Sequence, residues 1–306
     1  MRWLTEAVPS GRVAAFRTLV YLYVAGDLVI FTPWVRTHAA VPPELYQPLF
    51  VGRLLPLPTP TPLLVHGVFW VLLVAALLAA TGRAHRLLGW TVFALYLEWM
   101  IIAMSYGKVD HDRFAFLVAL AVLPTAGAAR HADRTPTERG GWALRVTQLA
   151  VVATYFLAFW AKVRFGGLGW ATGSVLARAI IRRGTDLADL IAVVPGLLIA
   201  AQVGIMAFEL LSPLVFGLRE RWRHAAVGFF YAFHLVTIAT ITISFAPHLV
   251  ALTSFLPLER AVARVRRAVV RLRPPGMPGL PAPGEREVSE EPTRYGDPRY
   301  EAPRSG

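Results

Sequence analysis

Residues 62–81 read PLLVHGVFWVLLVAALLAAT and contain no Asp, Glu, Lys or Arg. A helix that crosses the hydrocarbon core of a bilayer needs about 20 mostly apolar residues. A membrane-spanning β-strand is shorter and alternates apolar with polar side chains, and this stretch does not alternate. It therefore predicts a transmembrane α-helix.

Similar apolar runs fill most of the chain up to residue 258. The expected spans are residues 13–32, 62–81, 87–105, 114–129, 142–162, 189–217 and 224–256. The last run would measure about 50 Å as one helix, longer than a hydrocarbon core of about 30 Å. Pro247 offers a break, so we expect two pieces, 224–244 and 246–258. The sequence predicts an all-α polytopic membrane protein with seven or eight transmembrane helices, crossing the cell membrane several times.

The composition agrees with this fold class. Of the 306 residues, 56% are hydrophobic and 16% are charged, whereas soluble domains carry about 25% charged residues. A soluble enzyme, a disordered protein and a coiled coil are thereby excluded. The chain has no cysteine, which excludes disulfides, thiolate nucleophiles, Cys-ligated zinc and iron–sulfur clusters.

The basic residues predict the orientation. Two of the 31 basic residues, Lys108 and Lys162, are lysines. Cytoplasmic loops are enriched in Arg and Lys, which favours a cytoplasmic N-terminus. The inner loops are then 82–86, 130–145 and 218–223, and the outer loops are 33–61, 106–113 and 163–188. The outer loop 163–188 is an exception, since it carries several arginines. The net charge of +12 thus reports orientation and contact with anionic lipid, and no nucleic-acid partner is expected.

The sequence after the last span divides into two parts. Residues 259–273 place arginines at three- and four-residue spacing between apolar residues, which predicts a basic amphipathic helix lying on an anionic leaflet. Residues 274–306 are rich in Pro, Gly, Glu and Arg and are expected to be disordered.

Ionisable residues inside spans are costly in lipid and are treated as functional hypotheses. In the predicted topology, Lys162, His111, Asp110 and Asp27 all fall toward the outer side. We expect them to converge on one cavity. Burial disfavours the charged form of a lysine, so Lys162 could act as a base. The alternative is that Lys162 snorkels to the interface.

The other polar residues within the spans have mainly structural interpretations. Arg17, Glu98 and Glu209 are expected to be structural. Glu209 lies on the cytoplasmic half of its helix, where pairing with an arginine such as Arg17 is weighed against a catalytic role. His234 would either form a hydrogen bond across helices or face a ligand. No compact metal-binding or phosphate-binding motif is present.

A family resemblance rests on residues 155–163, which read YFLAFWAKV and are followed by Trp170 and Gly173. This pattern resembles the signature of the HTTM family, which includes the membrane part of vitamin K-dependent γ-glutamyl carboxylase and short bacterial proteins. Phe159 stands at a family glycine, and Ala161 precedes the lysine. Further likeness is found at Phe16-Arg17 with Asp27, Val109 to Phe114, Phe208-Glu209 with Pro213, Phe233-His234, and Ser244-Phe245 with residues 252–257.

The resemblance covers residues 12–258 and implies an HTTM-like bundle in the domain 1–258. It implies that Lys162 is a base toward a lipid quinone cofactor, and that His111 stabilises intermediates with Asp110 beside it. The expected substrate or quinone pocket is completed by Asp27, His234, Trp170 and Lys108. The carboxylase's extramembrane recognition domain is not expected here, so carboxylation of protein glutamates is not expected either.

Three function classes stay open from the sequence. The first is a quinol-using oxidoreductase or carboxylase-like membrane enzyme. The second is a maturation or export factor for a secreted peptide, as in short relatives that resemble the maturation protein of a sporulation-delaying toxin. The third is a non-catalytic scaffold or transporter, which the lack of internal repeats disfavours.

Overall fold

The computed structural model describes residues 2–271. The chain divides into two compact units, Met1–Val265 and Arg266–Gly306, and the description below concerns the first. The predicted disordered segment 274–306 and the end of the predicted basic helix lie outside the described residues. The helix α13 covers Leu258–Arg271, where the sequence predicts the basic amphipathic helix, and its contact with a membrane stays a prediction.

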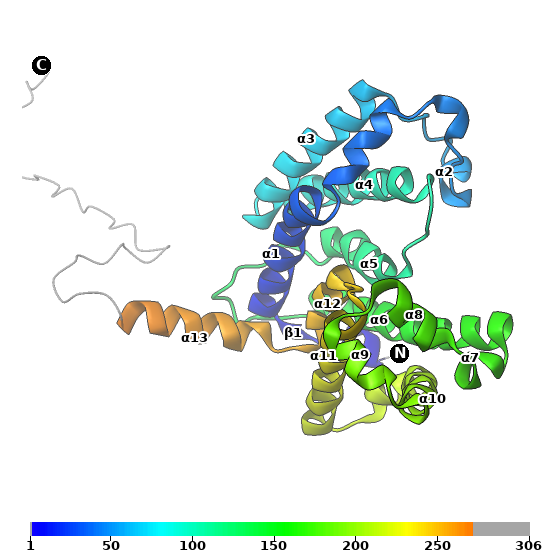
Figure 1. The fold of residues 1–306 in the computed structure, drawn as a ribbon. Helices are drawn as coiled ribbons and strands as arrows, with labels where there is room; N and C mark the ends of the chain where they lie inside the picture. Colours follow the sequence, from blue (N-terminus) through cyan, green and yellow to red (C-terminus); the bar gives the residue numbers. More distant parts are fainter. Residues whose placement is uncertain (1, 272–306) are drawn as a thin grey trace, which may run out of the picture. The chain divides into compact units, whose positions relative to one another are not determined.

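Among the described residues, six helical segments are long and apolar enough to cross a membrane. The prediction of a multi-pass all-α membrane protein is thereby confirmed (Figure 1). Two of the six are compound: α1 is extended by a wider π-type turn, η2, and α10 is extended by the tighter helical turn η7. The segments are Ser10–Phe31 (α1, Ser10–Gly26, with η2, Asp27–Phe31), α3 (Pro62–Ala80), α4 (His85–Met104), α6 (Glu138–Gly166), Pro195–Gly217 (α10, Pro195–Leu211, with η7, Ser212–Gly217) and α11 (Glu220–Ile241).

Two predicted spans form shorter helices than expected. The first is α5 (Phe114–Val122) with the turn η6 (Leu123–Thr125), and the second is α12 (Ala246–Leu252) with the turn η8 (Thr253–Phe255). The two helices pack against each other and against α6. Their inward side chains are fully buried, Phe116 and Leu252 among them. Both helices pack largely against protein, although Phe114 at the start of α5 is exposed, so the length requirement of a fully lipid-exposed helix does not apply to them.

The predicted break near Pro247 is confirmed. Helix α11 ends at Ile241, and Thr242 adopts a left-handed conformation with φ of 54°. Residues 242–245 are not helical, and Pro247 lies in the first turn of α12, where the missing backbone N–H costs nothing. The predicted span 189–217 is also interrupted, because a separate short helix, α9 (Asp186–Ala192), precedes α10.

Several chain segments meet at the end where α1 begins. Strand β1 (Val8–Pro9) pairs antiparallel with β2 (Pro136–Thr137). Arg12 binds Glu259 through two hydrogen bonds of 2.8 and 2.9 Å. The N-terminal turn η1 (Arg2–Thr5) packs on α6, because Gly141 leaves room for the backbone of Glu6. The N-terminus, the 130–137 loop and the residues after α12 therefore share one end of the bundle.

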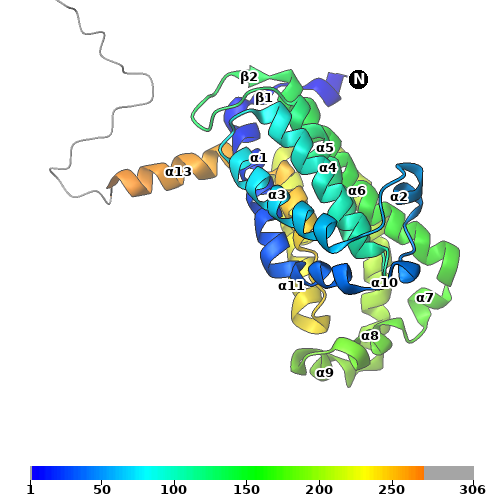
Figure 2. The ribbon, with the colours of Figure 1, turned by 90° about the horizontal axis from the view of Figure 1, so that it is seen from above.

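Short helices cover the opposite end. Figure 2 shows α7, α8 and α9 gathered beside the start of α10, with which all three pack. Gln202 on α10 fixes this group through hydrogen bonds to Leu176 N, Ala171 O and Gly173 O. The remaining elements there are η3 (Pro33–Ala40), η4 (Pro43–Leu45), α2 (Phe50–Leu54), η5 (His111–Arg113), α7 (Gly169–Thr172) and α8 (Val175–Arg183).

Candidate functional site

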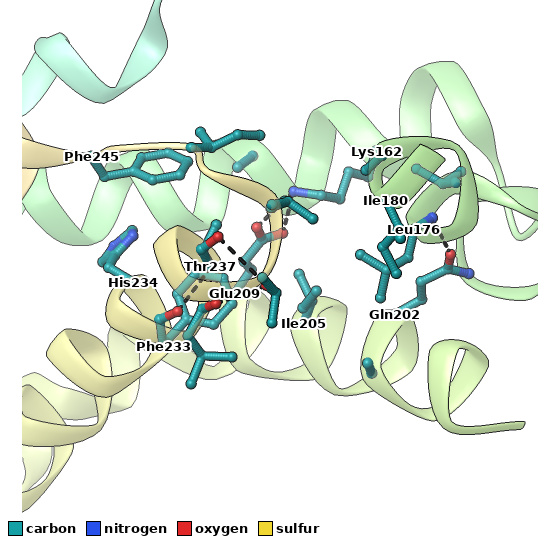
Figure 3. Close-up of a pocket in the computed structure, with 18 of the residues that line it drawn as sticks. Lys162, Leu176, Ile180, Gln202, Ile205, Glu209, Phe233, His234, Thr237 and Phe245 are labelled. Atoms are coloured by element: carbon teal, nitrogen blue, oxygen red, sulfur yellow. Dashed lines mark hydrogen bonds and ion pairs between the residues drawn. The ribbon is translucent and has the colours of Figure 1, made fainter. Parts of the chain in front are cut away.

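A cavity of about 460 Å³, here called the chamber, lies between α6, α8, α10, α11 and α12 (Figure 3). Most of its walls are aliphatic or aromatic side chains. The polar side chains among its lining residues are His111, Thr154, Tyr155, Lys162, Trp170, Gln202, Glu209, His234, Thr237, Thr240 and His248. An apolar cavity with few convergent polar groups is the usual form of a ligand site.

Lys162 and Glu209 form an ion pair in the chamber wall. Lys162 Nζ donates to both carboxylate oxygens of Glu209, at 2.6 and 2.8 Å, as Figure 3 shows. The Glu209 side chain is 7% exposed. Trp170 places its ring centre 5.0 Å from the same ammonium group, a cation–π distance. Glu209 and Trp170 thus fix the position of the Lys162 ammonium group at the edge of an apolar cavity.

A second polar group lies across the chamber. His234 Nε2 lies 2.7 Å from the hydroxyl of Tyr155, and the ring of His248 lies 5.4 Å from that of His234. His248 is 1% exposed, and neither of its ring nitrogens has a partner among the described residues. The same holds for Nδ1 of His234. Buried polar atoms normally have partners, so these nitrogens are suited to a ligand.

A second cavity of about 470 Å³, here called the vestibule, adjoins the chamber. Its walls are more polar and include Lys108, Asp110, Asp112, Arg113 and Arg183. Three residues, His111, Ile243 and Phe245, line both cavities. The chamber and the vestibule are therefore neighbours that share one wall.

Two titratable groups of the vestibule have shifted pKa values. The surrounding protein removes water from His111, and Lys162 and Lys108 add positive charge, so its pKa is lowered against a smaller opposing effect of Asp110. His111 is accordingly neutral at pH 7. Burial raises the pKa of Asp112 to about 6, although Arg113 opposes the shift.

Asp27 does not reach the chamber that the sequence predicts for it. Its fully buried carboxylate accepts hydrogen bonds from Arg113 Nη1 at 2.8 Å and from the hydroxyl of Tyr96 at 2.9 Å. Thr32 adds a bond to its backbone oxygen. The carboxylate of Asp27 is thus fully hydrogen-bonded, and these bonds link the end of α1 to α4 and to η5.

The predicted pairing of Glu209 with Arg17 is wrong. Glu209 binds Lys162 because α10 begins at Pro195 and lies along α6 with the carboxylate beside that lysine. Arg17 is buried on α1 and donates from Nη2 to Gly127 O at 2.5 Å. Glu98 is buried on α4, and its carboxylate oxygens have no hydrogen-bond partner within the described part of the chain.

The other predicted site residues divide between the two cavities. Lys162, His111, Trp170 and His234 line the chamber. Asp110 and Lys108 line the vestibule, where they pair with each other at 2.9 Å. Lys162 and His111 therefore share one cavity as expected, whereas Asp110 lies in the neighbouring vestibule.

Sequence reasoning missed His248, Phe245, Gln202 and the role of Arg113. His248 gave a weak signal, since a histidine beside Pro247 in an apolar run marks a helix start with a buried polar side chain. Gln202 is likewise a polar residue inside a predicted span. Phe245 could not be found, because its importance arises only from the wall that it shares with His111.

In the part of the chain that the structure describes, no group of three His, Asp or Glu side chains could hold a metal ion. Comparison with known proteins found no family model, no curated protein and no solved structure that matches the chain. The site geometry is therefore the basis for a functional proposal.

Proposed function

We propose that this protein is a membrane oxidoreductase or carboxylase-like enzyme whose chamber binds a lipid quinone or quinol. One observation carries the proposal: the apolar chamber has two separate polar groups, the Lys162–Glu209 pair and the His234–His248 pair. A quinol ring carries oxygens at opposite positions and is otherwise apolar. In Figure 3, Lys162 and His234 lie on different sides of Glu209, so each polar group would meet a different oxygen of such a ring.

The residues fit this class of ligand because the buried nitrogens of His248 and Nδ1 of His234 have no partner among the described residues. A neutral imidazole offers one donor and one acceptor, so each histidine can bind a hydroxyl or a carbonyl oxygen. The quinone class would supply two-electron redox chemistry coupled to protons.

Lys162 is the residue that would exchange a proton with the ligand. Its Nζ lies against Glu209, so a proton can reside on the amine or pass to the carboxylate without a charge being left unpaired. The apolar walls from α8, α10 and α11 exclude water, which strengthens such interactions. In this pair Lys162 is an ammonium ion, so it would act as a general base after its proton passes to Glu209. The neutral amine would then accept the ligand's proton, and the ammonium ion that forms would face the ligand's oxyanion.

We also propose eight membrane crossings in an HTTM-like bundle, with the N-terminus in the cytoplasm. The bond between Arg12 and Glu259 supports an even number, because it joins the start of α1 to the residue after the last crossing. The short helices α5 and α12 complete the eight. The chamber and the vestibule would then face the extracytoplasmic side.

The test is purification in mild detergent followed by mass spectrometry of co-extracted lipids. Wild-type protein is expected to retain a prenylated quinone, and His248→Leu and Lys162→Met are each expected to retain roughly tenfold less, which corresponds to about 1.4 kcal/mol of binding energy. Lys108→Met removes the other lysine, outside the chamber, and should retain the wild-type amount.

Two results would contradict the quinone assignment. Wild-type protein that takes up no quinone from quinone-containing vesicles would exclude this ligand class. Equal retention by His248→Leu and wild type would show that the chamber is not the binding site. A co-purified peptide in place of a lipid would favour the peptide-maturation alternative.

A further inference from the structure

Three residues from two segments, His111, Ile243 and Phe245, form the wall between the chamber and the vestibule, and two of them carry rings. His111 belongs to η5, and Phe245 belongs to the link between α11 and α12. Their ring centres are 6.1 Å apart. Phe245 also lies 4.7 Å from the ring of His234. The rings of His111 and Phe245, here called the partition, therefore lie, together with Ile243, between the vestibule and the polar groups of the chamber.

The backbone that carries Phe245 lies outside regular helix. Residues 242–245 belong to no helix; backbone bonds join Thr242 N to Ile238 O and Leu249 N to Phe245 O, and Thr242 Oγ1 donates to Arg183 O at 3.2 Å. Segments with few backbone hydrogen bonds open at low free-energy cost. Phe245 is thus placed where a side chain can move without melting a long helix.

The two cavities differ in the polarity of their linings, and therefore in the molecules that they can bind. The vestibule is lined by charged residues of the 108–113 loop and by Arg183, a surrounding that water can solvate. The chamber is lined mainly by apolar side chains of α8, α10 and α11. A proton that reaches or leaves the Lys162–Glu209 pair needs a polar path, and His111 is the polar residue that belongs to both compartments.

We propose that the vestibule is the aqueous side of the site, and that water and protons exchange with the Lys162–Glu209 pair through the partition. His111 takes up a proton at one ring nitrogen from the chamber side and releases one from the other nitrogen to vestibule water, which returns it to neutral. Phe245 keeps bulk water out when the partition is closed. This exchange route holds for any apolar ligand in the chamber.

The charges around His111 are compatible with this role. Lys162 faces it from α6 and His248 from α12, and Lys108 and Asp110 precede it in its own loop. Asp112 and Arg113 follow it, and Arg183 of α8 lines the same vestibule. The pKa of His111 is lowered by the surrounding protein, Lys162 and Lys108, so the ring is neutral at pH 7 and can accept a proton.

The experiment uses the two lysines as reporters. Protein in sealed phosphatidylcholine–phosphatidylglycerol vesicles is treated with a membrane-impermeant sulfonated succinimidyl ester, and acylation of each lysine is followed by mass spectrometry. Lys108 is 67% exposed and reports access to the vestibule. In Phe245→Ala, the ratio of Lys162 to Lys108 acylation is expected to rise roughly tenfold or more, because truncation leaves a gap of side-chain size.

Phe233→Ala is the matched control, since Phe233 lines the chamber and is absent from the vestibule lining. Its acylation ratio should equal that of wild type. An unchanged ratio in Phe245→Ala, with Lys108 still reactive, would overturn the proposal. An equal rise in Phe233→Ala would do the same, because access would then not depend on the partition.

A second measurement keeps Phe245 in place and applies if its truncation prevents folding. The chain has no cysteine, so single thiols can be introduced at Ser244, which lines the vestibule, and at Ala158, which lines the chamber. An impermeant maleimide should modify Ser244→Cys from the same side as Lys108 and leave Ala158→Cys protected. Equal rates at the two positions would show that the partition does not separate the compartments.

Discussion

The ion pair between Lys162 and Glu209 joins two side chains that are mostly withdrawn from solvent, at 19% and 7% exposure. Removal of one partner from such a pair leaves an uncompensated charge in an apolar wall, at a cost of about 3–5 kcal/mol. Glu209→Gln should therefore lower the melting temperature in detergent markedly. The double variant Lys162→Met with Glu209→Leu should regain much of the loss, because neither charge then needs a partner.

The exposed pair between Lys108 and Asp110 provides the control. Because the Lys108 side chain is 67% exposed, Lys108→Met should change stability by less than about 1 kcal/mol. Equal melting temperatures for Glu209→Gln and wild type would mean that water reaches Lys162 freely.

The stability of the folded chain is expected to depend on pH through Asp112. Burial raises the pKa of this residue to about 6. An unfolded aspartate has a pKa of about 3.9, so between these values the folded chain holds a proton that the unfolded chain has lost. The contribution of Asp112 to stability is therefore full below about pH 4 and falls as the pH rises to about 6, by about 1–2 kcal/mol after allowance for solvent.

Asp112→Asn should remove this slope and should be more stable than wild type above pH 6, since the amide cannot ionise. Thermal unfolding in detergent at several pH values measures the effect. A variant that keeps the wild-type slope between pH 4 and 6 would assign the dependence to another group.

How much of the site the sequence could predict differs between its residues. Lys162 is conspicuous because one of only two lysines lies at the end of an aromatic span. The sequence could not predict that Glu209 is its partner, because the position of Glu209 along the bundle axis depends on the residue at which α10 begins. The sequence identifies Asp27 as an ionisable residue inside a span but places it wrongly in the cavity, because Arg113, which binds its carboxylate, belongs to a loop whose path only the fold determines.

At the scale of helices, Gln202 holds the group of α7 and α8 against α10. Its three hydrogen bonds reach Leu176 N, Ala171 O and Gly173 O, each worth about 0.5–1.5 kcal/mol. In Gln202→Leu, the amides of residues 169–183 should exchange with deuterium roughly tenfold faster or more, while the amides of α3 and α4 stay protected.

Gln148→Leu is the matched control for this prediction. Gln148 lies on α6 and donates to Ser254 O at 2.8 Å, so its loss should raise exchange around η8 and leave residues 169–183 unchanged. Faster exchange throughout the chain in Gln202→Leu would contradict the prediction, because it would indicate global destabilisation instead of local opening.

The long apolar helices could be predicted from the sequence, and the short ones could not. Hydropathy identifies residues 62–81 because a lipid-exposed helix needs unbroken apolar sequence. Helices α5 and α12 bury their side chains in protein, so nothing requires them to reach full length. Pro247 revealed the break before α12, but the end of α11 at Ile241 depends on the left-handed turn at Thr242.

At the scale of the whole molecule, the two ends of the bundle make the crossing number testable. The pairing of β1 with β2 and the bond between Arg12 and Glu259 bring the N-terminus, the 130–137 loop and the start of α13 to one end. In the proposed membrane arrangement, residues 12 and 259 at one end of the bundle require an even number of crossings between them. The proposed orientation puts the arginines near these segments on the cytoplasmic side, with the arginines of α8 as the exception.

The absence of cysteine permits a direct measurement of this topology. Single thiols at Thr37, Ala132, Ser174 and Ala261 alter no charge, so they do not disturb the signals that orient the helices. An impermeant maleimide applied to intact cells should modify Thr37→Cys and Ser174→Cys, whereas Ala132→Cys and Ala261→Cys should react only after the membrane is opened. Modification of Ala261→Cys in intact cells, together with protection of Ala132→Cys, would require an odd number of crossings and would place Glu259 across the membrane from Arg12. That outcome is incompatible with the ion pair between them, so the position of one thiol decides between seven and eight crossings.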